Sequence, residues 1–334
     1  SRVELGFLFQ LQEGVEVFLQ PQVNYVWGGR QNVSGTNQAA GEDQLRIYQA
    51  WVALHPEIFG LNAVIKVGRQ ELAFGSEMLL GNNTRYGGLS FDAVRVDIKP
   101  LSGLTTSLFG AKVVENEQGY TDGGSGNLGD KHNDPSDVYL YGLWNTLVLD
   151  GLDTTIDVYG LLFQVERGLN DGTAAVGDYN GMPLVEQDLY TVGARVKITP
   201  IELAPKHAFD ADFSAEVAGQ FGKVYEGGDE KDVEAYAFET EAGMTFGAIP
   251  WTPRLAIGFA AASGNQDPTG DTDRTFRPLF QDTTDRLGDA DLVSLSNMNC
   301  WYLKASAKPL EKLELGMAYY HIEARHNEDT VGGG

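Results

Sequence analysis

Charged residues stand at alternate positions in several segments of the sequence that read as extended chain. Arg195 and Lys197 are two residues apart, as are Glu239 and Glu241. Successive side chains of a β-strand point to opposite faces, so each of these pairs lies on one face of a strand. Rings of fixed charge inside a pore select ions and polar solutes by their charge and by the width between them. The spacing therefore indicates a charged, water-lined wall.

Catalytic constellations are not visible. The sequence has no HExxH, no paired CxxC, no GxSxG and no phosphate-binding loop, and its five histidines are scattered over His55, His132, His207, His321 and His326. A hydrolase site at the rim, built from His321 with Glu323 or Asp137, is the enzymatic alternative. The acidic stretch 265–291 could bind Ca²⁺ through its carboxylates, but it lacks the spacing of an EF-hand. We expect no catalytic residues, no metal site and no cofactor.

The elements that would position these charges are long alternating strands. Residues 14–28, GVEVFLQPQVNYVWG, place one apolar face, ending in Tyr25 and Trp27, against a face of amides and acids. Strands of soluble domains usually stop after about 5 or 6 residues. A tilted strand of about 13 residues crosses roughly 30 Å, the thickness of the hydrocarbon core of a bilayer. The pattern predicts a strand of outer-membrane length.

The same pattern recurs to the end of the chain. Alternating segments bounded by turn residues cover 2–11, 14–27, 44–55, 62–71, 90–99, 103–114, 136–149, 153–166, 187–199, 208–222, 232–247, 253–264, 293–308 and 311–324. Short connections such as 100–102 alternate with long ones such as 115–135, as the periplasmic turns and outer loops of membrane barrels do. The sequence predicts an all-β fold, a transmembrane antiparallel β-barrel with at least fourteen strands.

The order of short and long connections indicates whether these strands alone can close into a barrel. The first strand would start, and the last would finish, on the side of the long loops. We therefore expect residues 1–334 to form a single outer-membrane β-barrel domain that lacks terminal strands, with about 16 to 18 strands in the full protein. The alternative is that fourteen strands close on themselves. Pro21 donates no backbone hydrogen bond, so we expect a β-bulge or an unpaired neighbour beside it.

Composition narrows the classes of partner. The 47 acidic and 24 basic residues give a net charge of −23, which argues against nucleic acid and against a polybasic membrane-surface protein. No apolar run approaches the roughly 20 residues of a membrane helix. The lone Cys300 rules out a disulfide framework within the chain.

Two motifs resemble the alginate-export family of outer-membrane barrels. The first is GRQELAFGSEMLLGNNTRYGGLSFDAVRVD at 68–97, and the second is SGNQDP followed by TFRPLFQDTTDRLGDAD within 263–291. The resemblance implies a barrel of about 18 strands that conducts solute, located in the outer membrane of a Gram-negative bacterium. The type member exports the polyanion alginate through an arginine-rich pore, which implies an anionic polysaccharide or oligosaccharide as cargo.

If apolar residues face lipid, the polar residues of each strand line the pore. We predict the pore-lining set Gln20, Gln22, Lys66, Arg69, Gln70, Asp92, Arg95, Asp97, Arg195, Lys197, Asp212, Glu216, Glu239 and Glu241. For an alginate exporter, basic residues should outnumber acids at the narrowest point. The alternative is a solvated polar wall that selects nothing in particular.

Two details of this set stay open. Alternation with Ile65 and Val67 puts Arg69 on the lipid face, so either a bulge at Gly68 re-aims it or it already lies above the apolar band. A structural ion pair between Arg69 and Asp92 is the competing interpretation. Apolar residues in the long outer loop also suggest that this loop folds inward as a constriction, which would involve Phe276, Arg277 and Phe280.

Two functional hypotheses follow. The first is a non-enzymatic channel through which a hydrophilic solute or polysaccharide crosses the outer membrane passively. The second is a plugged structural barrel that scaffolds a larger envelope complex. The expected partners are outer-membrane lipid, the solute and, for the second hypothesis above all, a periplasmic or envelope protein, with no nucleic acid.

Overall fold

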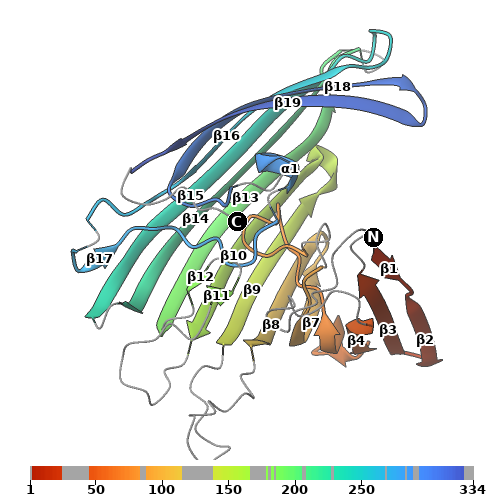
Figure 1. The fold of residues 1–334 in the computed structure, drawn as a ribbon. Coiled ribbons are helices and arrows are strands. Elements are labelled where there is room, and N and C mark those ends of the chain that lie inside the picture. Colours follow the sequence, from red (N-terminus) through yellow and green to blue (C-terminus); the bar gives the residue numbers. More distant parts are fainter. Residues whose placement is uncertain are drawn as a thin grey trace, which may run out of the picture.

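The computed structural model describes residues 2–24, 45–82, 88–114, 138–165, 178–179, 182–183, 186–204, 208–226, 229–267, 269–282, 284–288 and 293–326. Most of these residues belong to one curved antiparallel sheet (Figure 1). Within the described residues, no helix is both long and apolar enough to cross a bilayer.

The sheet is a meander in which each long strand pairs with its neighbours in sequence. Its strands are β1 (Arg2–Glu4), β2 (Phe7–Gln12), β3 (Val15–Asn24), β4 (Leu45–Leu54), β6 (Leu61–Gln70), β7 (Phe91–Leu101), β8 (Leu104–Val114), β9 (Val138–Leu149), β10 (Thr154–Val165), β13 (Gln187–Glu202), β14 (Asp210–Glu226), β15 (Asp229–Thr245), β16 (Arg254–Ala262), β18 (Met298–Leu310) and β19 (Leu313–Ala324). Because β1 and β2 both pair with β3, they form one interrupted strand, and the described chain has fourteen spans. The predicted strands are confirmed to within a few residues.

The connections between these strands contain short strands, a 3₁₀-turn and a short helix. They are β5 (Glu57–Ile58), β11 (Asp178–Tyr179), β12 (Met182–Pro183), β17 (Thr272–Asp273), the 3₁₀-turn η1 (Asp150–Leu152) and the helix α1 (Thr284–Leu287). Tight turns join the strands at one end of the sheet. Between β7 and β8, Gly103 has φ +77°, and a Cβ there would lie 2.4 Å from the carbonyl oxygen of Val148. The turn and the close approach of β9 both require glycine.

The two faces of the sheet differ as the alternation predicts. On β10, Val158 is 53% exposed, whereas its neighbours Asp157 and Tyr159 are buried. On β16, the exposed Leu255 and Ile257 alternate with alanine and glycine on the concave side. The convex face is therefore apolar, as the lipid-facing side of a membrane barrel is, and we call the concave face the lumen face.

A β-bulge accommodates Pro21. The register between β3 and β4 shifts between Gln20, which pairs with Gln49, and Pro21, which pairs with Ile47. On the other side, the carbonyl oxygen of Pro21 accepts a hydrogen bond from the backbone amide of Leu5 at 3.2 Å. The expected bulge is present, so the missing proline donor leaves the sheet continuous.

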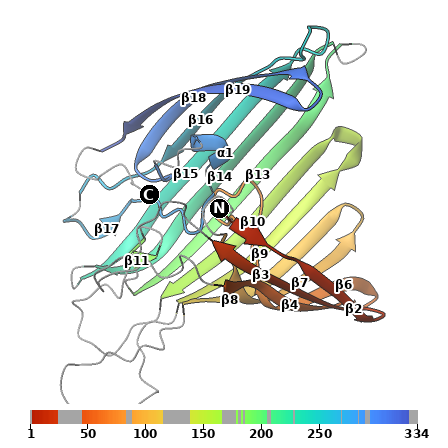
Figure 2. The ribbon, with the colours of Figure 1, turned by 45° about the vertical axis from the view of Figure 1, so that its right-hand side comes forward.

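Two long connections fold onto the lumen face. The described parts of the β6–β7 loop (residues 71–82 and 88–90) and of the β16–β18 loop (residues 263–267, 269–282, 284–288 and 293–297) run inside the curved sheet, in orange and blue (Figures 1 and 2). Their apolar side chains join those of the lumen face in the hydrophobic core of the structure, which includes Leu79, Phe163, Phe276 and Phe280. The interior of this sheet is thus partly filled by its own loops.

The sheet has two edges that do not meet. Within the described residues, β2 and β19 each pair on one side only, and they lie apart in both views (Figures 1 and 2). Every residue of β2 is exposed, as are the first seven of β19.

Candidate pore constriction

The two inner loops are joined to each other by backbone hydrogen bonds. Leu80 and Phe280 form a parallel β-bridge. The amide of Gly81 donates to the carbonyl of Phe280 at 2.7 Å, and the amide of Phe280 donates to the carbonyl of Leu79 at 2.9 Å. Two residues further along the second loop, the amide of Asp282 donates to the carbonyl of Glu77 at 2.9 Å. The loops therefore form one unit inside the lumen.

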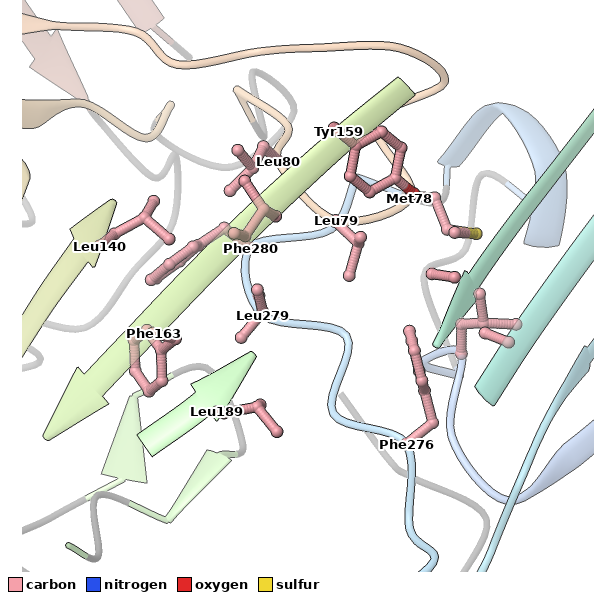
Figure 3. Close-up of a cluster of buried hydrophobic side chains, with 14 of the residues drawn as sticks. Met78, Leu79, Leu80, Leu140, Tyr159, Phe163, Leu189, Phe276, Leu279 and Phe280 are labelled. Atoms are coloured by element: carbon pink, nitrogen blue, oxygen red, sulfur yellow. The ribbon is translucent and has the colours of Figure 1, made fainter. Parts of the chain in front are cut away.

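Apolar packing fixes this unit to the wall. The ring of Phe280 meets those of Phe91 and Phe163 edge-on, at centroid distances of 5.0 and 5.8 Å. Figure 3 shows Leu79 and Leu80 of one loop near Leu279 and Phe280 of the other, beside the neighbouring strands that carry Leu140, Phe163 and Leu189. Of the residues predicted for a loop constriction, Phe276 and Phe280 are 0% and 1% exposed.

Arg277, the third predicted constriction residue, is held by polar contacts. It donates to Asp273 at 2.6 Å, and its backbone exchanges two hydrogen bonds with the side chain of Gln220 on β14. Burial raises the pKa of Asp273, but the charge of Arg277 and the amide of Thr275 outweigh it and hold that pKa below its ordinary value. Asp273 is therefore ionised near neutral pH.

Aromatic stacking fixes the start of the β6–β7 loop. Phe74 stacks on Phe109 and Trp144, at 5.2 and 5.1 Å, and Trp144 stacks on Tyr159 at 3.9 Å. Next to Phe74, Gly75 has φ +64°, and a Cβ there would lie 2.7 Å from the Trp144 ring. Glycine is what allows the loop to turn this close to the wall.

A polar cavity lies between the loop unit and the wall. Its volume is about 540 Å³. Charged side chains dominate its lining, with five acids and four bases: Glu77, Glu216, Glu239, Glu241, Asp282, Arg195, Lys197, Arg286 and Lys304. We call this space the chamber.

On the loop side of the chamber, Ser76 contacts two carboxyl groups of the wall. Its hydroxyl lies within hydrogen-bond distance of Glu216 Oε2 and 2.7 Å from Glu239 Oε1. Glu216 and Glu239 are Cα partners on β14 and β15. Tyr159 donates to Glu216 at 2.8 Å, and Arg286 Nε lies 2.7 Å from Glu239 Oε2.

Ion pairs also connect neighbouring strands of the wall around the chamber. Arg195 binds Asp157 at 2.8 Å. Arg254 forms a two-pronged pair with Asp212, at 2.6 and 3.0 Å. The network of Arg254 continues through Glu241, which contacts Arg254 at 2.9 Å and Lys304 at 2.8 Å. Paired in this way, the wall charges keep fixed positions.

The structure brings most of the predicted pore-lining residues onto the lumen face. Arg195, Lys197, Glu216, Glu239 and Glu241 line the chamber itself. The remaining lumen-face members lie elsewhere on the concave wall, namely Gln20, Gln22, Lys66, Gln70, Arg95, Asp97 and Asp212.

These remaining members have differing surroundings. Lys66 covers the ring of Trp51 at 4.2 Å, and Arg95 binds Asp97 at 2.8 Å. Gln20 and Gln22 both donate to Glu4, at 2.8 and 2.7 Å. Gln70 is fully buried and donates to backbone carbonyls, so it faces no open space.

Arg69 and Asp92 lie on the other face. They share it with the exposed Val67 and Val94, and they form a two-pronged ion pair at 2.6 and 2.9 Å. Pairing of β6 with both neighbours runs through Gly68 without a register shift, so the bulge that would re-aim Arg69 is absent. The structure thus contains the ion pair that ties two strands together.

Ser76 and Arg286 were not among the predicted residues. Ser76 lies in the β6–β7 loop and Arg286 in the short helix α1 of the β16–β18 connection, where no strand alternation assigns a face to a side chain. The apolar run Met78–Leu80 carries the same signal as Phe276 and Phe280, since it too is apolar sequence within a long loop.

Two further kinds of site considered from the sequence are a metal site and a hydrolase site at His321. Among the described residues, no group of three or more His, Cys, Asp or Glu could hold a metal ion. His321 contacts Glu323 at 2.8 Å on the exposed strand β19, and Asp137 lies outside the described residues.

Three solved structures share the fold of this sheet, and one of them is described as a porin. OccK11 (OpdR) of Pseudomonas aeruginosa is 16% identical, with a TM-score of 0.55 over 97% of this chain and 74% of that one. OccK9 (OpdG) of the same organism is 12% identical, with a TM-score of 0.55 over 98% and 77%. A BenF-like porin from Pseudomonas fluorescens is also 12% identical, with a TM-score of 0.55 over 96% and 74%.

Sequence comparison gives a family. No curated protein matches the chain. The family model described as alginate export matches residues 10–334, which confirms the resemblance of the two motifs. With a porin-like sheet and an apolar outer face, the chain is thus a β-barrel protein of the Gram-negative outer membrane, and it belongs to the alginate export family.

Proposed function

We propose that the protein is a passive channel for hydrophilic solutes, and that the chamber is its narrow region. The observation that carries this proposal is the polar cavity of about 540 Å³ left between the inner loops and the wall. A plug would need apolar packing to fill this space, whereas charged side chains line it. Solutes would be selected by the width of the chamber and by its fixed charges.

The charge of the chamber bears on the cargo. Its five acids and four bases are nearly balanced, so the expected excess of basic residues is not found among the described residues there. Strong preference for anions therefore needs cations elsewhere on the path. Lys66, elsewhere on the lumen face, supplies one, and Lys197 is a chamber base that an anion can meet, since neither lysine forms an ion pair within the described part of the chain.

We propose an anionic oligosaccharide or polysaccharide as the class of cargo. This finer assignment is supported by membership of the alginate export family and by these two lysines. Hydroxyl groups of a saccharide can exchange hydrogen bonds with both the acids and the bases of the chamber, which suits a wall of mixed charge.

The barrel also needs closure. We propose that residues 1–334 belong to one barrel domain in which further strands pair with β1–β2 and with β19. Unpaired backbone amides in hydrocarbon cost several kcal/mol each, and both edge strands are exposed. The structural relatives are longer, because this chain spans 74% of OccK11 and 77% of OccK9.

Planar-bilayer recording tests the function. The purified protein should give discrete conductance steps, and oligouronates on either side should interrupt the current in a concentration-dependent way. A neutral oligosaccharide of the same length is the control for charge. A barrel that inserts but never conducts would contradict the channel, and equal block by the neutral sugar would contradict the anionic cargo.

A further inference from the structure

Ser76, Glu216 and Glu239 form a contact that needs one proton more than a serine hydroxyl and two ionised carboxylates provide. Three oxygen atoms meet there, and both carboxyl oxygens lie within hydrogen-bond distance of the same hydroxyl. A serine hydroxyl donates one hydrogen bond, and an ionised carboxylate only accepts. If both carboxyl groups were ionised, the Ser76 hydroxyl could donate to only one of them. Its contact with the other would then bring two oxygen atoms together with no proton between them. A second proton is therefore required.

We propose that Glu216 holds this proton, and that the resulting hydrogen-bond chain is a pH-dependent latch that keeps the β6–β7 loop against the wall. In the latched state, Tyr159 donates to Glu216, protonated Glu216 donates to Ser76, and Ser76 donates to the carboxylate of Glu239. Arg286 compensates the charge of that carboxylate. The proposal rests on the channel function, and it adds a regulation to it.

The positions of the two arginines decide which carboxyl group is neutral. Arg286 Nε lies 2.7 Å from Glu239, whereas the Arg195 Nε lies 3.8 Å from Glu216, beyond hydrogen-bond distance. Arg195 binds Asp157 instead, at 2.8 Å. The Glu216 side chain is only 2% exposed, and burying a charge without a close partner is costly.

Other ionisable groups around the pair do not supply the missing proton. Tyr159 is bound to the second oxygen of Glu216. Tyr302 of β18 and Glu241 of β15 also line the chamber near Glu239, and Glu241 is neutralised by Lys304 and Arg254. The groups that face the pair from the surrounding elements are Tyr159, Asp157, Arg195, Arg286, Glu241, Tyr302, Lys304 and Arg254.

Loss of the proton has two effects on the chamber. The loop edge formed by Gly75, Ser76 and Glu77 is one side of the chamber, so breaking the latch lets this side move away from β14 and β15. Ionised Glu216 also adds a negative charge to a nearly balanced wall. Rising pH should therefore widen the passage and shift its preference toward cations.

Single-channel recording from about pH 4 to about pH 9 tests the latch, because this range brackets the titration of buried carboxyl groups. We expect the wild-type conductance to rise in one step as pH increases. Glu216→Gln offers an amide donor to Ser76 and a carbonyl to Tyr159, so it should lose the step and stay at the low-pH conductance. Ser76→Ala removes the middle of the chain, so its low-pH conductance should rise toward the high-pH value.

Glu241→Gln is the matched control. It removes one acid from the same chamber wall but no member of the latch, so the pH step should remain. A Glu216→Gln variant that keeps the wild-type step would overturn the proposal, as would a conducting wild type without any step. Either of these two results would leave the channel function intact. If neither the wild type nor any of the variants conducts, the channel function itself is contradicted.

An infrared measurement tests the proton without requiring conduction. The folded wild type at neutral pH should show the carbonyl band of a protonated carboxyl group, and Glu216→Gln should lose it. If the band is missing from the wild type, or persists in Glu216→Gln and disappears in Glu239→Gln, Glu216 does not hold the proton.

Discussion

Leu80 and Phe280 form a parallel β-bridge, although 200 positions separate them in sequence. The bridge joins two loops that leave the sheet from β6 and β16, and it makes them a single body inside the lumen. The aperture of the proposed channel is therefore set by contacts between loops as much as by the diameter of the sheet.

Truncation of Phe280 should loosen this body. Phe280→Ala removes a buried ring that packs against Phe91 and Phe163, and such changes cost about 3 to 5 kcal/mol in well-packed cores. We expect a larger and noisier single-channel conductance. Phe221→Ala, on the lipid-facing side and 49% exposed, is the control and should leave the conductance unchanged. Equal conductance of wild type and Phe280→Ala would show that the loop does not limit the current.

Acid should release the β16–β18 loop through Asp273. The folded-state pKa of Asp273 is lower than its ordinary value, so its contribution to stability is complete above the ordinary pKa and is lost as pH falls through the folded one. Hydrogen exchange of this loop should increase only in acid, below about pH 4. In Asp273→Asn the fast exchange should already be present at neutral pH. Fast exchange of the wild-type loop at neutral pH would contradict the role of the pair.

Arg69 and Lys197 should differ in their effect on ion selectivity. Lys197 lines the chamber, whereas Arg69 lies on the outer face and binds Asp92. Lys197→Gln should shift the reversal potential in a salt gradient toward cation preference. Arg69→Gln, which removes the same charge, should lower stability by about 1 kcal/mol or less and leave the reversal potential where it is. A shift in Arg69→Gln as large as that in Lys197→Gln would place both side chains on the ion path.

Cysteine cross-linking should show whether β2 and β19 meet. Direct closure would bring some Cα pairs across these strands within about 7 Å, the upper limit for a disulfide. We expect no disulfide between Leu8→Cys and Met317→Cys, or between cysteines at the neighbouring positions, because further strands lie between the edges. Ala194→Cys with Val217→Cys is the positive control, since these residues are Cα partners on β13 and β14. A cross-link between the two edges would support closure by fourteen spans alone.

The sequence predicted the strands well because the pattern that encodes them is local. Residues 153–166 were expected to be extended, and β10 covers Thr154–Val165. The prediction is poorest where a strand joins an inner loop. The segment 293–308 was expected to be one strand, but β18 begins at Met298, because Asn297 has φ 46° and turns the chain into the lumen.

The constriction was only partly predictable, for a physical reason. Apolar residues at Phe276 and Phe280 signalled an inward fold, since a loop in water has no use for them. The partners of these residues depend on how two distant loops fit the same space, which no local period records. Ser76 is the clearest case, because its proposed role depends on contacts with Glu216 and Glu239, which lie 140 and 163 positions further along the chain.

The bridge between Leu80 and Phe280 also constrains the order of assembly. One partner is made early in synthesis and the other late, so the passage can take its final bore only after most of the sheet has formed. Contacts of such long range are slow to form. Until they do, the half-built wall encloses a wider and less selective opening, so restricted permeability is among the last properties that the folding protein acquires.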